Sequence, residues 1–133
     1  MPSLDTNVLL RHLLRDDARQ GALVEQLMSR CIQESIPLFI PATVLLELEW
    51  VLRSRFGFDK AQVIEALAGL AASNETMFES EEPLEVALEL FRTSSADFAD
   101  CLHVAVSARM VRLPLWTFDR KAASLMGASL LAA

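Results

Sequence analysis

The sequence has no apolar run approaching the ~18 residues with which a helix crosses a bilayer, and no charged-then-apolar signal pattern at its start. Its only cysteines are Cys31 and Cys101, which make neither a disulfide framework nor a zinc-ligand spacing. It also lacks internal repeats, low-complexity segments and Gly/Ser-rich linkers. We therefore expect a cytoplasmic protein with buried thiols, no membrane contact, and a single domain over residues 1–133.

Positive charge is scarce, since 12 Lys and Arg residues stand against 18 Asp and Glu, for a net charge of −6. An acidic surface by itself disfavours a nucleic-acid partner. However, each divalent cation bound by acidic residues would add 2 to the charge, giving −4 with one ion and −2 with two. Lys60 and Lys121 are the only lysines, and the arginines that make up the remainder suit bidentate contact with phosphate. Charge therefore leaves nucleic acid possible.

Short apolar segments alternate with longer helical patterns along the chain. Strands are predicted at residues 37–40, 75–78, 113–118 and 129–131, with the end of another at 3–5. Helices are predicted over residues 8–14, from after 17 to about 34, and over about 41–55, 59–72, 80–92 and 98–111. No hairpin turn signal joins the strands, so we predict an α/β sandwich with a parallel sheet.

Acidic residues follow two of the predicted strands. Asp5 and Asp119 each fall at a predicted carboxyl end, where parallel sheets bind ligands. An aspartate after a strand is also a common turn or cap residue, so each position alone has a plain structural explanation.

Glu47 lies within an apolar helical segment, residues 44–52. Helical spacing places Glu47 on the same face as Val44, Leu48 and Val51, and Glu49 on the opposite face. We therefore expect the Glu47 side chain to point toward the core. A buried carboxylate needs a cation, a hydrogen-bond partner or a proton. The alternative is a surface glutamate at the margin of the core.

The helix expected at 98–111 begins with further acids. Asp97 and Asp100 lie one turn apart on one face, and Asp97 also suits the N-cap. Asp100 would then lie in the first turn, where its negative charge interacts favourably with the helix dipole. Its position alone therefore does not make it catalytic. His103 neighbours Asp100 at i+3 and is more often a packed or supporting residue than a ligand in such a place.

Carboxylates gathered at one sheet end, with few histidines, would form an all-oxygen site that selects Mg²⁺ or Mn²⁺ over zinc. We expect Asp5, Glu47, Asp100 and Asp119 in this site. The sequence has no nucleophilic Ser, Cys or His pattern and no Gly-rich phosphate loop. Attack by metal-activated water on a phosphodiester is the simplest mechanism.

Four segments, taken in order, carry a family resemblance: LDTNVLL at 4–10, LELEWVL at 46–52, DFADCLHVA at 97–105 and TFD at 117–119. The chain resembles the PIN-domain nucleases, in particular the VapC-type toxins of bacterial toxin–antitoxin pairs. This resemblance implies a three-layer sandwich, with a central parallel sheet flanked by helices, and a metal-dependent endoribonuclease. Cys101 and His103 depart from the apolar or aromatic residues of many relatives.

The resemblance also assigns roles by position. It makes Asp5 and Asp100 the main metal ligands, with Glu47 completing the site or activating water, and Asp119 binding metal directly or through water. Asn7 and Thr117 match polar positions that support the first aspartate, and Asp97 matches a supporting acid. It further implies an RNA substrate, a homodimer and an antitoxin partner. Guiding the RNA backbone is our own inference for Arg11, Arg15, Arg53, Arg55 and Arg120, with ordinary surface use the equal alternative.

Three other functions stay open. A phosphatase could use Asp5 as a covalent nucleophile, but Asn7 stands where a second aspartate is expected and no suitable lysine follows. A non-catalytic domain could bind a basic peptide through its acids, and a PIN-fold nuclease could process RNA outside a toxin pair. A gene for a small DNA-binding protein directly upstream would favour the toxin.

Overall fold

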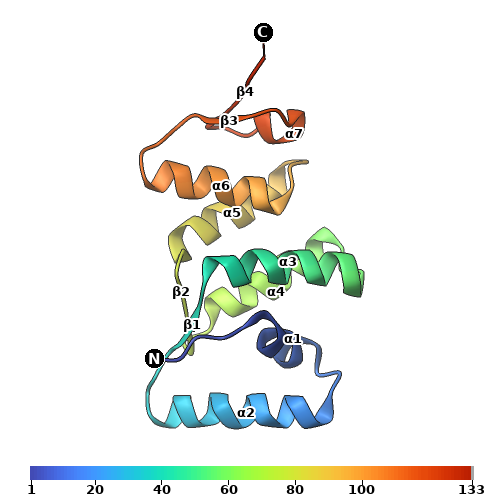
Figure 1. Ribbon diagram of the computed structural model, residues 1–133, viewed down its shortest axis with the longest axis vertical. Helices are drawn as coiled ribbons and strands as arrows, with labels where there is room; N and C mark the ends of the chain where they lie inside the picture. The colour runs from blue at the N-terminus through green and yellow to red at the C-terminus, as the bar shows by residue number, and fades with distance from the viewer. Residues whose placement is uncertain (133) are drawn as a thin grey trace. The chain divides into compact units, whose positions relative to one another are not determined.

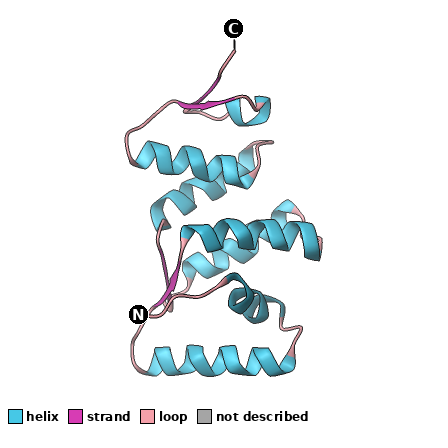
Figure 2. Ribbon diagram, in the orientation of Figure 1, coloured by secondary structure: helices cyan, strands magenta, loops and turns pink. Residues whose placement is uncertain are grey.

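Helices and short parallel strands alternate along the chain in the computed structural model, which describes residues 1–132 (Figure 1). Figure 2 shows how much of the chain is helical. The chain divides into two compact units, Met1–Glu79 and Ser80–Ala133. Within the described residues, the elements in order are α1 (Thr6–Leu14), α2 (Ala18–Gln33), β1 (Leu38–Ile40), α3 (Ala42–Phe56), α4 (Lys60–Ala72), β2 (Thr76–Phe78), α5 (Glu81–Thr93), α6 (Phe98–Arg109), β3 (Leu115–Thr117), α7 (Arg120–Ala123) and β4 (Ala128–Leu130).

The sheet of the first unit is parallel and is extended by the N-terminal residues. β1 pairs with β2, with Phe39 opposite Met77. On its other side, Phe39 forms a parallel bridge with Ser3, held by bonds from Leu4 N to Phe39 O at 2.9 Å and from Phe39 N to Pro2 O at 2.8 Å. The residues before Asp5 therefore behave as a short strand, as the sequence predicts.

Local side chains fix where the helices of the first unit begin and end. Asp17 accepts a hydrogen bond from Gln20 N and starts α2. Asp59 and Gln62 form the predicted capping box of α4, each side chain bonding to the other residue's backbone N–H. Gly57 ends α3 with φ +67°, a left-handed conformation that glycine adopts without strain.

The first unit has a continuous aliphatic core. Residues fully buried in it come from the sheet and from three helices: Leu9, Leu38, Ile40, Leu45, Leu48, Leu52, Val63 and Leu67. Burial of each such side chain stabilises the fold by about 1.5–3 kcal/mol relative to exposure. This core holds the starts of α1 and α3, which carry Asp5 and Glu47, against the sheet.

The second unit is built from α5 and α6 packed together, followed by the small β3–α7–β4 segment. Leu84, Ala87, Leu88 and Phe91 form the buried stripe of α5. Phe91 meets Phe98 of α6 edge to face, with ring centroids 5.7 Å apart. β3 and β4 pair in parallel, with Trp116 opposite Ser129.

The α/β class and the parallel pairing are confirmed, and the predicted helices and strands are observed with ends shifted by a few residues. The one-turn helix α7 was not predicted. Cys31 and Cys101 are buried free thiols, as expected. Among residues 1–132, no helix combines the length and apolarity needed to span a membrane.

Candidate active site

Asp5 is exposed at the N-cap of α1, directly after the short strand at Ser3. Its Oδ1 accepts a hydrogen bond from Thr6 N at 2.7 Å. The neighbouring Thr6 hydroxyl is buried without a hydrogen-bond partner among the described residues, a feature that sequence reasoning did not single out. Asn7 is exposed in the first turn of the helix. The cap bond therefore orients a carboxylate that stays open to solvent.

The prediction for the faces of α3 was wrong. Glu47 is exposed, whereas Glu49 is only 4% exposed. The Glu49 carboxylate accepts a hydrogen bond from Arg53 Nε at 3.0 Å, one turn further along the helix. Apolar residues occur all around this segment, so spacing alone did not identify the face that Leu45 and Leu52 bury.

Exposure does not remove Glu47 from consideration as a site residue. A carboxylate that binds a cation or accepts a proton from a substrate water has to be reached from solvent. The buried Glu49 is instead held by an ion pair within α3. The two glutamates thus have different environments on the same helix.

Asp100 lies half-buried in the first turn of α6. Burial raises the pKa of its carboxyl group above the ordinary value of 3.8, and the charges of Asp119 and Asp97 raise it further, while His103 lowers it. The Asp100 carboxyl group is therefore perturbed mainly by burial, and then by the opposing charges of His103 and the two aspartates. This is the electrostatic environment expected for a group that binds a cation.

The neighbours of Asp100 take the positions that helical spacing predicts. Asp97 is the N-cap residue of α6, although its side chain makes no capping hydrogen bond, and its backbone oxygen accepts from Cys101 N at 3.1 Å. Asp97 and His103 are both exposed. The charges of both residues act on Asp100, with Asp97 raising its pKa and His103 lowering it.

Asp119 is the N-cap of α7 and follows β3 by two residues. Its Oδ1 accepts a hydrogen bond from Ala122 N at 2.9 Å, and its backbone N donates to Thr117 Oγ1 at 3.0 Å. The expected support of Asp5 by Thr117 stays a prediction, since the two residues belong to different units. Two bonds thus fix the start of α7 and the orientation of this exposed carboxylate.

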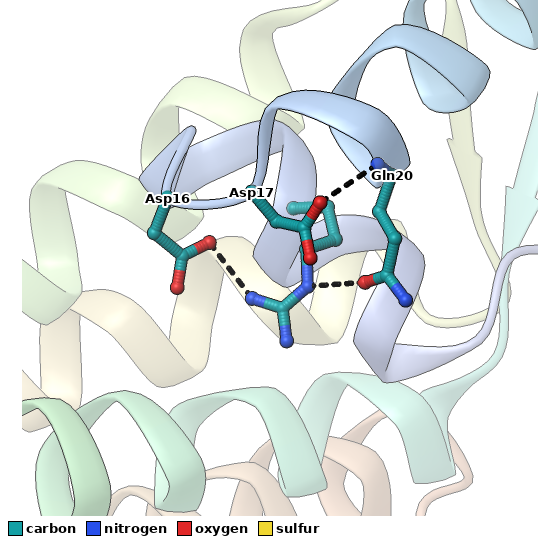
Figure 3. Close-up of polar contacts among 4 residues, drawn as sticks. Asp16, Asp17 and Gln20 are labelled. Carbon is teal, nitrogen blue, oxygen red and sulfur yellow. Dashed lines mark hydrogen bonds and ion pairs between the residues drawn. The ribbon is translucent and has the colours of Figure 1, made fainter.

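The five arginines proposed to guide RNA differ in their surroundings. Arg11 donates to Asp16 Oδ1 at 2.8 Å and to Gln20 Oε1 at 2.7 Å (Figure 3). The Asp17 carboxylate beside them accepts a hydrogen bond from Gln20 N and caps α2. This network ties the end of α1 to the start of α2. Arg53 pairs with Glu49. Arg15, Arg55 and Arg120 are exposed.

Glu79 is a residue that sequence reasoning missed. It follows β2, and its Oε1 accepts a hydrogen bond from Ala42 N at 2.9 Å. The N-cap of α3 is Pro41, which makes no side-chain capping bond of its own. Glu79 therefore caps from a distance the helix that carries Glu47. Only the folded backbone brings these positions together, so no local pattern could have indicated it.

The candidate acids are divided between the units. Asp97, Asp100 and Asp119 interact electrostatically within the second unit, and Asp5 and Glu47 belong to the first. Within residues 1–132, neither unit by itself contains three or more His, Cys, Asp or Glu side chains placed to hold a metal ion. A cavity of about 620 Å³ in the first unit, lined by residues of α1, α2 and α4 among others, contains none of these acids.

Comparison with known proteins identifies the family of this chain. The PIN domain family model matches residues 3–126, nearly the whole chain. A relative described as VapC ribonuclease, from Aquifex aeolicus (strain VF5), is 26% identical over 123 residues, covering 91% of this chain and 89% of the relative. The matched range contains Asp5, Glu47, Asp100 and Asp119. The chain belongs to the PIN domain family.

Proposed function

We propose that this protein is a metal-dependent endoribonuclease and the toxin of a type II toxin–antitoxin pair. The observation that carries the proposal is the state of Asp100, whose carboxylate is half-buried and faces the charges of Asp97 and Asp119. Membership of the PIN family and the similarity to a VapC ribonuclease support the activity. The site residues that we propose are Asp5, Glu47, Asp100 and Asp119.

The donor set fits a hard divalent cation. All four side chains offer carboxylate oxygens, which Mg²⁺ and Mn²⁺ prefer. Burial is the main cause of the raised pKa of Asp100, and the charges of Asp119 and Asp97 add to it, so a cation bound at this carboxylate would favour its ionised form. Asp5 and Asp100 would hold the ion. When bound, it would lower the pKa of a water molecule and stabilise negative charge on the phosphate.

The remaining steps belong to the side chains. Glu47, exposed on α3, would accept a proton from the attacking water at its carboxylate. The hydrogen bond from Ala122 N holds the Asp119 side chain in one orientation. Its carboxylate would therefore be in place for binding before the substrate arrives. Asp97 would keep the potential at Asp100 negative, which favours cation binding over an empty site.

The function implies partners. The substrate would be single-stranded RNA, because the backbone of an unpaired strand can approach the acids closely and its bases can be splayed out. An antitoxin with a basic segment would be attracted by the net charge of −6. We further propose a homodimer that works in the cytoplasm, where its RNA substrates are.

Sequencing of new RNA 5′ ends after brief expression would test the activity directly. We expect discrete cleavage sites with the parent protein and none with Asp5→Asn. Glu89→Gln is the matched control, since Glu89 is an exposed acid that pairs with Arg92 on α5. The purified protein should cut RNA with Mg²⁺ or Mn²⁺ and stop in excess EDTA. Undiminished cleavage in the chelator would exclude the metal mechanism, and absence of cleavage under all conditions would favour a non-catalytic binding domain.

A further inference from the structure

Two large aromatic side chains stand in solvent immediately before Asp119. Phe118 is 78% exposed and Trp116, two residues earlier, is 60% exposed. Between them, Thr117 accepts the hydrogen bond from Asp119 N that fixes the start of α7. The backbone at these aromatic residues is therefore set by the same interactions that orient the Asp119 carboxylate.

Phe118 is the most exposed phenylalanine among the described residues, ahead of Phe56 at 40%. Phe78, Phe91 and Phe98 are all buried, as expected for a residue whose burial stabilises a fold. Single exposed apolar residues are ordinary, but two large exposed aromatic residues two positions apart, directly before a candidate catalytic acid, favour a binding role. Trp116 adds the second flat ring.

The residues that follow carry positive charge. Arg120 and Lys121 are exposed in α7, directly after Asp119. Phosphate contacts are made by such cations, and bases stack on aromatic faces in proteins that bind single-stranded nucleic acid. Residues 116–121 thus place stacking groups and cations on either side of one candidate site carboxylate.

We propose that Phe118, assisted by Trp116, is a stacking platform for an unpaired base of the RNA next to the phosphate that is cut. This inference rests on the proposed ribonuclease function and adds a base-binding subsite to it. Stacking accepts any base, so the subsite would select single-stranded over paired RNA and leave sequence choice to other contacts. Arg120 and Lys121 would hold the adjoining phosphates.

Binding of RNA, measured without cleavage, tests the platform. The protein carries Asp100→Asn throughout and is kept in EDTA, and its affinity for a short single-stranded RNA is compared with that for an abasic strand of the same length. We expect Phe118→Ala to weaken binding of the RNA about tenfold, within the range for loss of one base stack. The abasic strand should bind the parent and the variant equally.

Three controls separate stacking from other effects. Phe118→Leu keeps an apolar side chain without a π face and should bind as weakly as Phe118→Ala, whereas Phe118→Trp should retain affinity. Met126→Ala removes an apolar side chain that is 89% exposed and should leave affinity unchanged. Melting temperatures of all variants would confirm folding.

Equal affinity of Phe118→Ala and the parent for RNA would overturn the platform while leaving the ribonuclease proposal intact. Failure of the parent to bind any RNA would instead count against the proposed function. A variant that binds RNA normally but loses self-association or antitoxin binding would assign the two aromatic residues to a protein partner, and the platform would be wrong.

Discussion

The Glu79 carboxylate accepts a hydrogen bond from Ala42 N at 2.9 Å, across 37 residues of the chain. The first N–H groups of a helix have no partner within the helix, and Pro41 supplies no capping side chain at the start of α3. A negative charge here also complements the helix dipole. Glu79 thus joins the end of β2 to the helix that carries Glu47.

Replacing Glu79 by alanine should therefore destabilise the protein by about 1 kcal/mol, the usual cost of losing a cap. Glu79→Gln keeps an acceptor oxygen and should restore most of this stability. Urea denaturation of the three proteins would measure the difference. Coincident midpoints for the alanine variant and the parent would show that the bond to Ala42 contributes nothing.

Glu47 and Glu49 should separate activity from stability. We expect Glu47→Gln to lower the cleavage rate at least ~100-fold, the scale of losing a positioned proton-transfer group, with little change in melting temperature. Glu49→Gln should keep the rate within a few-fold but lower stability by about 1 kcal/mol, because the ion pair with Arg53 becomes a hydrogen bond from the charged guanidinium to a neutral amide oxygen. Parent-like cleavage by Glu47→Gln would remove Glu47 from the site.

Asp100→Asn should abolish cleavage and raise the melting temperature of the metal-free protein at pH 7. The folded-state pKa of Asp100 lies above its ordinary value of 3.8, so the folded protein holds this proton more tightly than the unfolded chain. Ionisation of Asp100 therefore lowers stability as pH rises through the folded-state pKa.

The same linkage between ionisation and folding determines how the difference in stability between Asp100→Asn and the parent depends on pH. The advantage of Asp100→Asn should be present at pH 7, shrink as the pH falls through the folded-state pKa, and be lost below the ordinary value of 3.8, where Asp100 is mostly protonated in both states. Thermal unfolding in EDTA across this range would measure it. A lower melting temperature for Asp100→Asn at neutral pH would make the carboxylate a structural group.

Metal binding should be visible without activity. Mg²⁺ or Mn²⁺ added to the chelator-free parent should raise its melting temperature, since an ion bound only by the folded state stabilises it. The rise should be much smaller in Asp5→Asn and in Asp100→Asn. Glu89→Gln should respond as the parent does, and a rise of equal size in all four proteins would indicate binding elsewhere.

The fold was predictable because its local signals agree. The capping box of α4, the glycine after α3 and the apolar strand between two prolines each mark a boundary that the structure shows. The helix α7 was missed because it has a single turn and lies between strand signals. The helix begins where Asp119 accepts the hydrogen bond from Ala122 N. In the sequence, an aspartate after a strand is equally typical of a turn.

The sequence predicts the neighbourhood of Asp97 and Asp100, which the structure shows, while the membership of the four acids in one site stays a prediction. The order of the acids is a property of the sequence. The electrostatic interaction of Asp97, Asp100 and Asp119 arises because the start of α6 and the end of β3 carry these residues. The orientation of α3 was not predictable, because apolar residues surround the helix and only packing selects the buried face. The contacts of Glu79 and Thr117 depend on folded backbone positions that spacing does not encode.

The buried pair within α3 has an evolutionary consequence. Glu49 is almost wholly enclosed, and its carboxylate accepts the bond from Arg53. Loss of the arginine alone would leave a buried charge poorly compensated, whereas loss of both would leave an ordinary helix. Substitutions at these two positions should therefore occur together. Homologues with an apolar residue at one position should also have lost the charged residue at the other.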